Sequence, residues 1–446
     1  MDRDAQPLAG SPKPLLSVAD GAFLMVGMVI GVGIFKAPSL VASNTSTPTE
    51  FILVWLFGGL ISLCGALVYA ELAARHPATG GEYTFLTRGF GPGAAFLFAW
   101  SRMTVIQTGA IAAVAFVFGD YASEIVSLGE HSSAIYAGLC VIALTGLNLA
   151  GTLQSKTLQK VLETVLIASL LGLAIGGMLS GGSTVPPKTP AGGALDLAML
   201  FVLFTYGGWN EAAYLGGEVR DPARNMMRIL VMGIVAVTIL YVLVNIGYVA
   251  ALGLQGVRDS KAVAVDLMRV LAGNKGAVVL ALIVCISAFT TINAAIFTGA
   301  RTNYALGRDF PLFSALGTWR DAGSTPANAL LAQGLITLAL VGAGSLTPDG
   351  FESMVAYTAP VFWTFFLLTG LTLFVLRRRE GAVAAFRVPL FPVVTTLFCA
   401  MCAFMLYKSV TYIMNPQFGP KFGMAVLAGL LVMAAGVPLY FVAKRK

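Results

Sequence analysis

Long apolar stretches dominate the sequence, and short charged or Gly/Pro-rich segments separate them. The stretches cover residues 18–43, 51–75, 93–119, 133–150, 158–180, 194–217, 228–252, 276–304, 326–344, 351–377, 388–412 and 422–443. Most are long enough to cross the hydrocarbon core of a bilayer as a helix, which takes about 20 residues. They do not alternate polar and apolar residues as barrel strands do. The pattern therefore predicts an all-α membrane protein with about twelve transmembrane helices.

Composition agrees with this interpretation. Of the 446 residues, 57% are hydrophobic and only 11% are charged, whereas a soluble globular protein carries about 25% charged residues. These values exclude soluble enzymes, nucleic-acid binders and disordered scaffolds. The polar opening segment, residues 1–17, is interpreted as a cytosolic tail and not as a cleaved signal peptide.

The basic residues predict the orientation. If the N-terminus lies inside, 19 of the 28 Lys and Arg residues fall in inner segments and 7 in outer segments, while Lys36 and Arg102 lie within helices. Cytoplasmic loops of membrane proteins are enriched in Lys and Arg. We therefore expect both termini in the cytosol and the helices in the cell (inner) membrane. The net charge of +7 follows from this topology and implies no nucleic-acid partner.

Two of the predicted helices carry an interruption. The stretch 18–43 contains Gly31 and Gly33 and then a lysine, and the stretch 194–217 contains Gly207-Gly208 followed by Trp209-Asn210-Glu211. Glycines in membrane helices often serve only close packing. The pair of interruptions, with polar residues after the second, favours two helices that unwind halfway. Unwound backbone is tolerated at membrane depth only where protein buries it or where it lines a cavity.

The interruptions fall in the first and the sixth helix, as two inverted five-helix repeats would produce, with a substrate site between the breaks. The predicted organisation is a tail (1–17), a first repeat (18–180), a second repeat (194–377) and two accessory helices (388–443). Amide groups at the start of the outer half of the first helix attract a carboxylate, and carbonyls freed at the breaks accept from an ammonium. The arrangement therefore suits a zwitterion.

Several motifs resemble the amino acid-polyamine-organocation superfamily. They are GVGIF in the first helix, ELAARHPATGGEY and FGPG between the second and third, and FTYGGWNEAAYLGGEVRDPARN across the sixth. The chain looks closest to bacterial relatives of the L-type amino acid transporters, from about residue 15 to residue 443. The resemblance implies a leucine-transporter-type fold. It also implies secondary transport of L-amino acids, expected to be neutral, by alternating access as a cation-coupled symporter or an exchanger.

The resemblance also implies a set of substrate-binding residues. They are Val29, Ile30, Gly31, Val32, Gly33, Ile34, Phe204, Gly207, Gly208 and Asn210. Backbone N–H groups around Gly33 would bind the carboxylate, and carbonyls at Val29, Phe204 and Gly207 would accept from the amine. The Phe204 ring would act as an outer gate, and Asn210 would support the site. Val32 replaces the usual serine of the family, so only its backbone donor counts.

The coupling ion, Na⁺ or H⁺, is less well defined, and no resident cofactor or metal is expected. Many relatives carry a lysine midway along the fifth helix, where this chain has Leu166. Thr290 and Thr291 in the eighth helix offer hydroxyls that could bind sodium together with carbonyls of the first break. In the alternative interpretation, the two hydroxyls only satisfy neighbouring carbonyls.

Charged residues inside the predicted helices are further candidates, because buried charges in membranes are rare and usually functional. Glu211 either carries a proton or steadies the unwound segment; the alternative is a neutral, hydrogen-bonded structural acid. Lys36 either stabilises anionic charge in an outer vestibule or is simply solvated.

Other charged residues are expected near the inner face. Arg102 and Glu163 would snorkel or form pairs there, and structural or gating ion pairs are expected for Glu71, Glu82 and Glu218.

Other functions find less support in the sequence. A membrane enzyme would need a nucleophile with a base or a metal cluster, and a channel would show a repeated filter motif or rings of charge; the sequence shows neither pattern. A basic amino acid or polyamine substrate remains an alternative because of Glu211. The predicted partners are a small-molecule substrate and membrane lipid. In the eukaryotic light-chain members of the family that the chain resembles, a cysteine in the loop after the third helix links a heavy subunit. The matching loop here, 119–132, contains no cysteine, so the resemblance implies no disulfide-linked heavy subunit.

Overall fold

A computed structural model of the chain describes residues 17–76, 81–151, 156–182, 194–211, 219–320, 325–381, 386–414 and 419–444. This part consists of helices joined by turns and loops, and an isolated bridge joins Arg320 to Thr325. The α-helices are α1 (Val18–Val29), α2 (Gly33–Ser43), α3 (Pro48–Arg75), α4 (Gly81–Phe90), α5 (Pro92–Ser101), α6 (Gln107–Ile125), α7 (Ser132–Leu149), α8 (Lys156–Leu179), α9 (Leu195–Thr205), α10 (Pro222–Asp259), α11 (Val263–Asp309), α12 (Ala327–Gly344), α13 (Gly350–Glu380), α14 (Val393–Thr411) and α15 (Gly419–Lys444). Shorter elements are the π-helical turn η1 (Arg102–Ile106) and the 3₁₀ turns η3 (Pro311–Gly317) and η4 (Tyr412–Met414).

The predicted spans agree with these helices. Within the described residues, ten helices are long and apolar enough to cross a membrane, and the bent pair α1 and α2 adds an eleventh span. The twelfth prediction, 194–217, is matched by α9 in its first half, while residues 212–217 lie outside the described part. So do the tail residues 1–16 and Glu218. The chain is thus a multi-pass membrane protein.

Local sequence signals set several helix starts. Ser17 accepts a hydrogen bond from the Asp20 amide at the start of α1, Thr47 does the same for Glu50 in α3, and Asp349 for Glu352 in α13. Such side-chain acceptors satisfy amide donors that have no partner within the helix.

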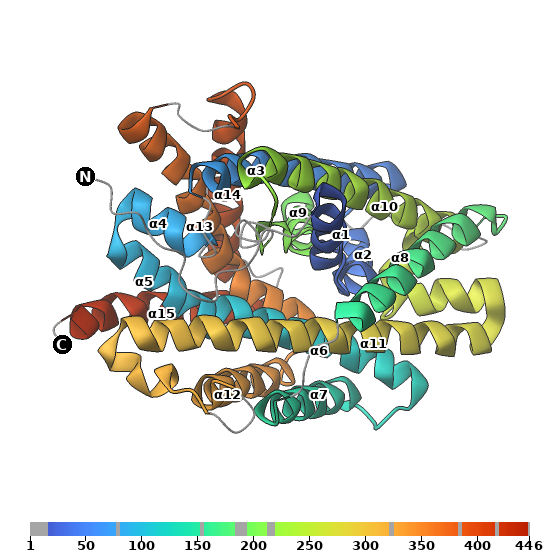
Figure 1. Cartoon of the computed structure of the whole chain (residues 1–446). Coiled ribbons are helices and arrows are strands. Elements are labelled where there is room, and N and C mark those ends of the chain that lie inside the picture. Colours follow the sequence, from blue (N-terminus) through green and yellow to red (C-terminus); the bar gives the residue numbers. More distant parts are fainter. Residues whose placement is uncertain are drawn as a thin grey trace.

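The helices surround a broken central element. In Figure 1, α1, α2 and α9 lie in the middle of the molecule, with α10 on one side and α6 and α11 on the other. α10 packs along α3 and α8 and also contacts α1 and α2, while α6 packs against α7, α11 and α13. α14 and α15 pack against α13 at the periphery, and large apolar side chains of α15 such as Leu431 and Phe441 remain exposed, as lipid-facing residues do.

Two connections between the predicted apolar stretches contain helices. α4 lies between the second and third spans, and the segment 253–275 continues α10 and begins α11, with left-handed glycines at Gly253 and Gly273. Hydropathy marks where apolar residues end, but a helix with charged residues continues into the aqueous layer without that signal. Figure 1 places α4 and η3 at one end of the molecule, called here the α4 end, and the α10–α11 connection at the opposite end.

Candidate functional site

The first helix is interrupted as predicted. α1 ends at Val29, α2 begins at Gly33, and the two axes differ by 52°. Gly31 lies beside open space, since a Cβ on it would meet only the Val29 carbonyl oxygen, at 4.0 Å. The first turn of α2 has no side-chain cap. Its amide groups, including those of Val32, Gly33 and Ile34, therefore offer the positive end of a helix to an anion.

The second interruption follows α9. After Thr205 the chain turns at Tyr206, Gly207 and Gly208 and continues in a 3₁₀ conformation at Trp209–Glu211. Gly208 has φ of +104°, a backbone conformation that costs glycine nothing and other residues a strain penalty. The helix therefore ends just before the predicted glycine pair.

The two interruptions lie against each other. A Cβ on Gly208 would overlap the Met28 carbonyl oxygen and come within 3.5 Å of the Val29 Cα. A Cβ on Gly33 would lie 3.3 Å from the Thr205 methyl group. The structure therefore brings the predicted glycines of both helices together, and their close approach depends on the missing side chains.

Two of the predicted amine acceptors already have donors. The Val29 carbonyl accepts from the Gly31 amide at 2.7 Å and from the Tyr241 hydroxyl at 2.9 Å. The Phe204 carbonyl accepts from the Gly207 amide at 3.0 Å. The Phe204 carbonyl also accepts a hydrogen bond from the Tyr206 amide at the end of α9. Because a carbonyl oxygen has two lone pairs, each of these two carbonyls has a donor for both of its lone pairs in this structure.

Phe204 and Asn210 flank the second break. The half-buried Phe204 ring packs edge-on against Phe351 of α13, with 6.0 Å between the ring centroids. Asn210 is buried, and its side-chain amide lies 3.4 Å from a carboxylate oxygen of Glu82 in α4. Phe204 thus lies between the break and the start of α13, and Asn210 connects the break to the α4 end.

Glu211 belongs to an ion-pair network toward the α4 end. Its carboxylate forms two contacts of 3.0 Å with the Arg102 guanidinium. Arg102 is only 6% exposed and also lies 3.9 Å from Glu82, which accepts a 2.6 Å bond from Tyr69. The prediction that Arg102 and Glu82 form pairs is confirmed. The Arg102 guanidinium thus connects Glu82 of α4 to Glu211 after the second break.

Glu71 forms a second cluster at the same end. Its fully buried carboxylate accepts from Arg75 at 2.9 Å, from Arg377 at 2.8 Å and from the Val388 amide at 2.7 Å. The predicted ion pairing of Glu71 is confirmed. In α4, burial and the proximity of Asp309 raise the pKa of Tyr83.

Lys36 corrects a prediction. It is 5% exposed, and its ammonium lies 2.8 Å from a carboxylate oxygen of Asp120 in α6 and 2.8 Å from one of Asp349 at the start of α13. The interpretation of Lys36 as a solvated residue was wrong, because the neighbouring helices enclose it. Sequence spacing gave no sign of its partners, which lie 84 and 313 residues away.

The fifth and eighth predicted helices, which correspond to α8 and α11, contain further residues singled out from the sequence. Leu166 of α8 is buried, and the Glu163 carboxylate on the same helix lies against Gly27 of α1. The Thr290 and Thr291 hydroxyls of α11 both donate to the Ser287 carbonyl, at 2.8 and 2.9 Å. The hydroxyls therefore satisfy a neighbouring carbonyl, as the alternative interpretation expects. A hydroxyl that donates in this way keeps lone pairs that could bind a cation.

The sequence did not identify Tyr241 of α10. This fully buried residue places its hydroxyl between the two breaks. The only sequence signal is a tyrosine within an otherwise apolar helix, since a buried tyrosine usually needs a hydrogen-bond partner.

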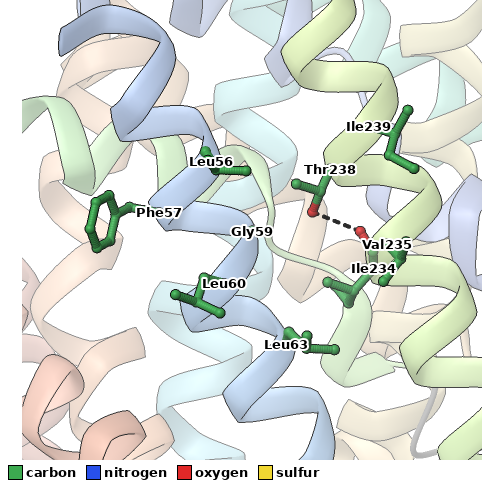
Figure 2. A pocket seen from close by; sticks show the side chains of 9 residues that line it. All are labelled: Leu56, Phe57, Gly59, Leu60, Leu63, Ile234, Val235, Thr238 and Ile239. Carbon is green, nitrogen blue, oxygen red and sulfur yellow. Dashed lines mark hydrogen bonds between the residues drawn. The ribbon is translucent and has the colours of Figure 1, made fainter. Parts of the chain in front are cut away.

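A large groove lies elsewhere, on the outside of the bundle. It has a volume of about 410 Å³ and is lined by α3 and α10; Figure 2 shows Leu56, Leu60 and Leu63 across from Val235 and Ile239. Thr238, the polar residue of the lining, donates to the Ile234 carbonyl within its own helix. An apolar groove with satisfied polar groups on a membrane-spanning surface suits lipid chains and offers no partner to a zwitterion.

Comparisons with known proteins follow the same direction as the geometry. The sequence model of a family described as amino acid permease matches residues 16–435. The chain is 30% identical over 397 residues to the b(0,+)-type amino acid transporter 1 of Mus musculus, covering 86% of this chain and 80% of that protein. It is 29% identical over 463 residues to the large neutral amino acids transporter small subunit 2 of Homo sapiens, covering 99% and 83%.

Proposed function

Because the chain belongs to the amino acid permease family, we propose that its two helix breaks bind the L-amino acid that this transporter moves across the membrane. The protein is a transporter and not an enzyme, because its family and its relatives are transporters. The proposed substrates are neutral amino acids, and the proposed mechanism is alternating access.

The observation that carries the proposal is the contact between the breaks. Gly208 lies against Met28, and Gly33 lies against Thr205, so unwound backbone from two helices meets at one place inside the bundle. The start of α2 supplies amide donors for a carboxylate. Helix ends carry carbonyls that suit an ammonium. The Val29 and Phe204 carbonyls already have donors in this structure, so an ammonium would displace one of these donors or bind the Gly207 carbonyl.

Ion pairs on both sides of the breaks support alternating access. At the far end from α4, Lys36 ties α2 to α6 and α13, and Phe204 packs on Phe351. At the α4 end, Arg102 pairs with Glu211. Opening toward either side requires α2 or the segment after Gly208 to separate from these partners. Contacts that exchange in this way can favour one accessible side at a time.

Neutral substrates are favoured over basic ones by the pairing of Glu211. Its carboxylate forms two contacts of 3.0 Å with Arg102, so its charge is already compensated. A relative described as a transporter of large neutral amino acids supports the same choice. The alternative is a basic amino acid or polyamine, which would require Glu211 to leave Arg102 for the substrate.

The proposed location is the cytoplasmic membrane with both termini in the cytosol, based on the distribution of Lys and Arg. We also propose that no heavy subunit is linked by a disulfide, although one group of relatives carries the words "small subunit" in its name. All five cysteines are buried, and none lies in the segment 119–132. The coupling ion is proposed to be Na⁺ or H⁺.

The direct test uses purified protein. Thermal-shift measurements against a panel of amino acids and amines are followed by counterflow uptake into proteoliposomes. We expect stabilisation and counterflow with neutral amino acids such as leucine, and neither with lysine or putrescine. Stabilisation by lysine or putrescine alone would support the alternative substrate. A protein that responded to no amino acid would contradict the proposed function.

A further inference from the structure

The apolar groove between α3 and α10 lies over a close crossing of the two helices. A Cβ on Gly59 would lie only 2.3 Å from the Thr238 hydroxyl oxygen, so the missing side chain lets the two backbones approach each other. Leu60 on α3 and Ile239 on α10 border the groove, and they are 50% and 55% exposed (Figure 2). The groove is therefore bordered by apolar side chains that face the membrane.

A basic residue continues the exposed face of α10 beyond the groove. Four exposed residues share this face, at spacings of four, three and four positions along the helix: Arg228, Met232, Val235 and Ile239. In the part of the chain that the structure describes, Arg228 forms no ion pair with an acidic side chain. An uncompensated cation therefore lies in line with an apolar groove on a surface that faces lipid.

The spacing along α10 matches one leaflet of a bilayer. At 1.5 Å per residue, Arg228 lies about 16 Å from Ile239, and half of the hydrocarbon core is about 15 Å thick. The start of α10 lies toward the α4 end, because the α10–α11 connection lies at the opposite end (Figure 1). In the proposed orientation the α4 end faces the cytosol, where the membrane surface is negatively charged. Arg228 therefore reaches the level of the headgroups, while the groove lies at the level of the acyl chains.

From this arrangement we propose that the groove and Arg228 together form a binding site for an anionic phospholipid. The Arg228 guanidinium binds the phosphate of the headgroup, with which it forms two parallel hydrogen bonds. One acyl chain lies in the groove between Leu60 and Ile239. A zwitterionic lipid binds more weakly, because the positive charge of its headgroup offsets the phosphate. The site is separate from the helix breaks and does not depend on the transported substrate.

The helices that form this groove also support both breaks. A Cβ on Gly58 of α3 would overlap Val202 of α9, and a Cβ on Gly233 of α10 would overlap Met25 of α1. α3 and α10 therefore pack directly on the first halves of the two broken helices. A lipid in the groove would contact this supporting pair from the membrane side.

The test is native mass spectrometry of the purified full-length protein in detergent micelles, titrated with phosphatidylglycerol or with phosphatidylcholine of identical chains. We expect the wild-type protein to bind phosphatidylglycerol with a Kd about fivefold lower than that for phosphatidylcholine, since one basic residue near an anionic lipid contributes on that order. Arg228→Gln should remove this preference. The matched control is Arg308→Gln, an exposed arginine near the end of α11 that lies away from the groove, and it should keep the preference.

A second pair of variants tests the position of the acyl chain. Val235→Trp fills the groove from an exposed position and should weaken the binding of both lipids. Leu282→Trp, at an exposed position of α11 outside the groove, should leave the binding of both lipids unchanged. Glycerol 3-phosphate, which carries the phosphate without acyl chains, should not displace the bound phosphatidylglycerol.

Three results would overturn the proposal. The first is equal binding of both lipids by the wild-type protein, and the second is an equal loss in Arg228→Gln and Arg308→Gln. The third is unchanged binding of phosphatidylglycerol by Val235→Trp or its displacement by glycerol 3-phosphate. The same spectra also report how many chains assemble, and a dimer that Val235→Trp dissociates would assign the groove to a second copy of this chain instead.

Discussion

Gly208 satisfies two requirements that no other residue meets. Its φ of +104° strains an L-residue, and a Cβ at this position would overlap the Met28 carbonyl oxygen. We expect Gly208→Ala to lower the transport rate by at least about tenfold, because the breaks could no longer approach each other. Counterflow uptake per folded protein measures this effect.

The control for that variant is Gly138→Ala. Gly138 lies in α7, and a Cβ there would meet nothing within 4 Å. Alanine is the better helix former by about 1 kcal/mol, so this variant should transport normally and melt at an equal or higher temperature. Normal transport by Gly208→Ala would show that the close contact of the breaks is not required.

Glu211 offers a second prediction at the scale of single residues. If the carboxylate carries the coupling proton, Glu211→Gln should abolish the dependence of uptake on pH while binding of the substrate persists. The physical reason is that the amide oxygen still accepts one hydrogen bond from Arg102, whereas the amide cannot ionise. Uptake at several external pH values measures this, and an unchanged pH profile would reject the proton-carrier role.

Among the elements, α2 is held by an ion pair that crosses three helices. Lys36 places one ammonium between Asp120 of α6 and Asp349, which also caps α13. Lys36→Met should lower the melting temperature and slow transport about tenfold. Removing one partner of a buried pair leaves uncompensated charge, which costs about 3–5 kcal/mol.

A triple variant separates charge from function. Adding Asp120→Asn and Asp349→Asn to Lys36→Met removes the uncompensated charges, and asparagine still caps a helix. The melting temperature should recover, whereas transport should stay slow if the ion pair is needed to close this side. Wild-type transport by Lys36→Met would contradict the role of Lys36 in closing.

The third span contains a π-helical turn. One π-helical turn, η1, interrupts it between α5 and α6, and the Tyr357 hydroxyl donates to the Thr104 carbonyl within that turn at 3.0 Å. Arg102 is the first residue of the turn, and Gln107, directly after it, donates to the Ala295 carbonyl of α11. Such turns often occur at functional sites. Here the turn contains Arg102, whose side chain pairs with Glu211.

At the scale of the whole molecule, the two ends carry different ionic contacts. The α4 end joins Arg75 and Arg377 through Glu71, and the other end joins three helices through Lys36. The breaks lie between them. The proposed alternating access would use this arrangement, with one end opening while the contacts of the other remain.

Coupling to sodium is a property of the whole cycle. If Na⁺ binds at Thr290 and Thr291, uptake into proteoliposomes should fall about tenfold when choline replaces sodium, since choline is too large for an oxygen-lined site. A double variant, Thr290→Val and Thr291→Val, should show the same low rate in sodium. Unchanged uptake in choline would exclude sodium as the coupling ion.

The sequence alone determined the environment, the spans and the position of the breaks. Apolar runs of bilayer length, 11% charge and glycines followed by polar residues are local properties, and lipid leaves a chain little choice but helices. The division into two inverted repeats stays a prediction. Hydropathy gave no sign of the helices that lie in the connections between apolar stretches, as at α4 and around Gly253 and Gly273.

Tertiary structure decided which residues meet. Lys36 finds Asp120 and Asp349, Arg102 finds Glu211, and Tyr241 finds Val29 and Thr205, all across long separations in sequence. These partners depend on how the helices rotate and pack, and similar apolar helices leave that rotation open. Local sequence shows where backbone must unwind, while packing alone determines which side chain satisfies it.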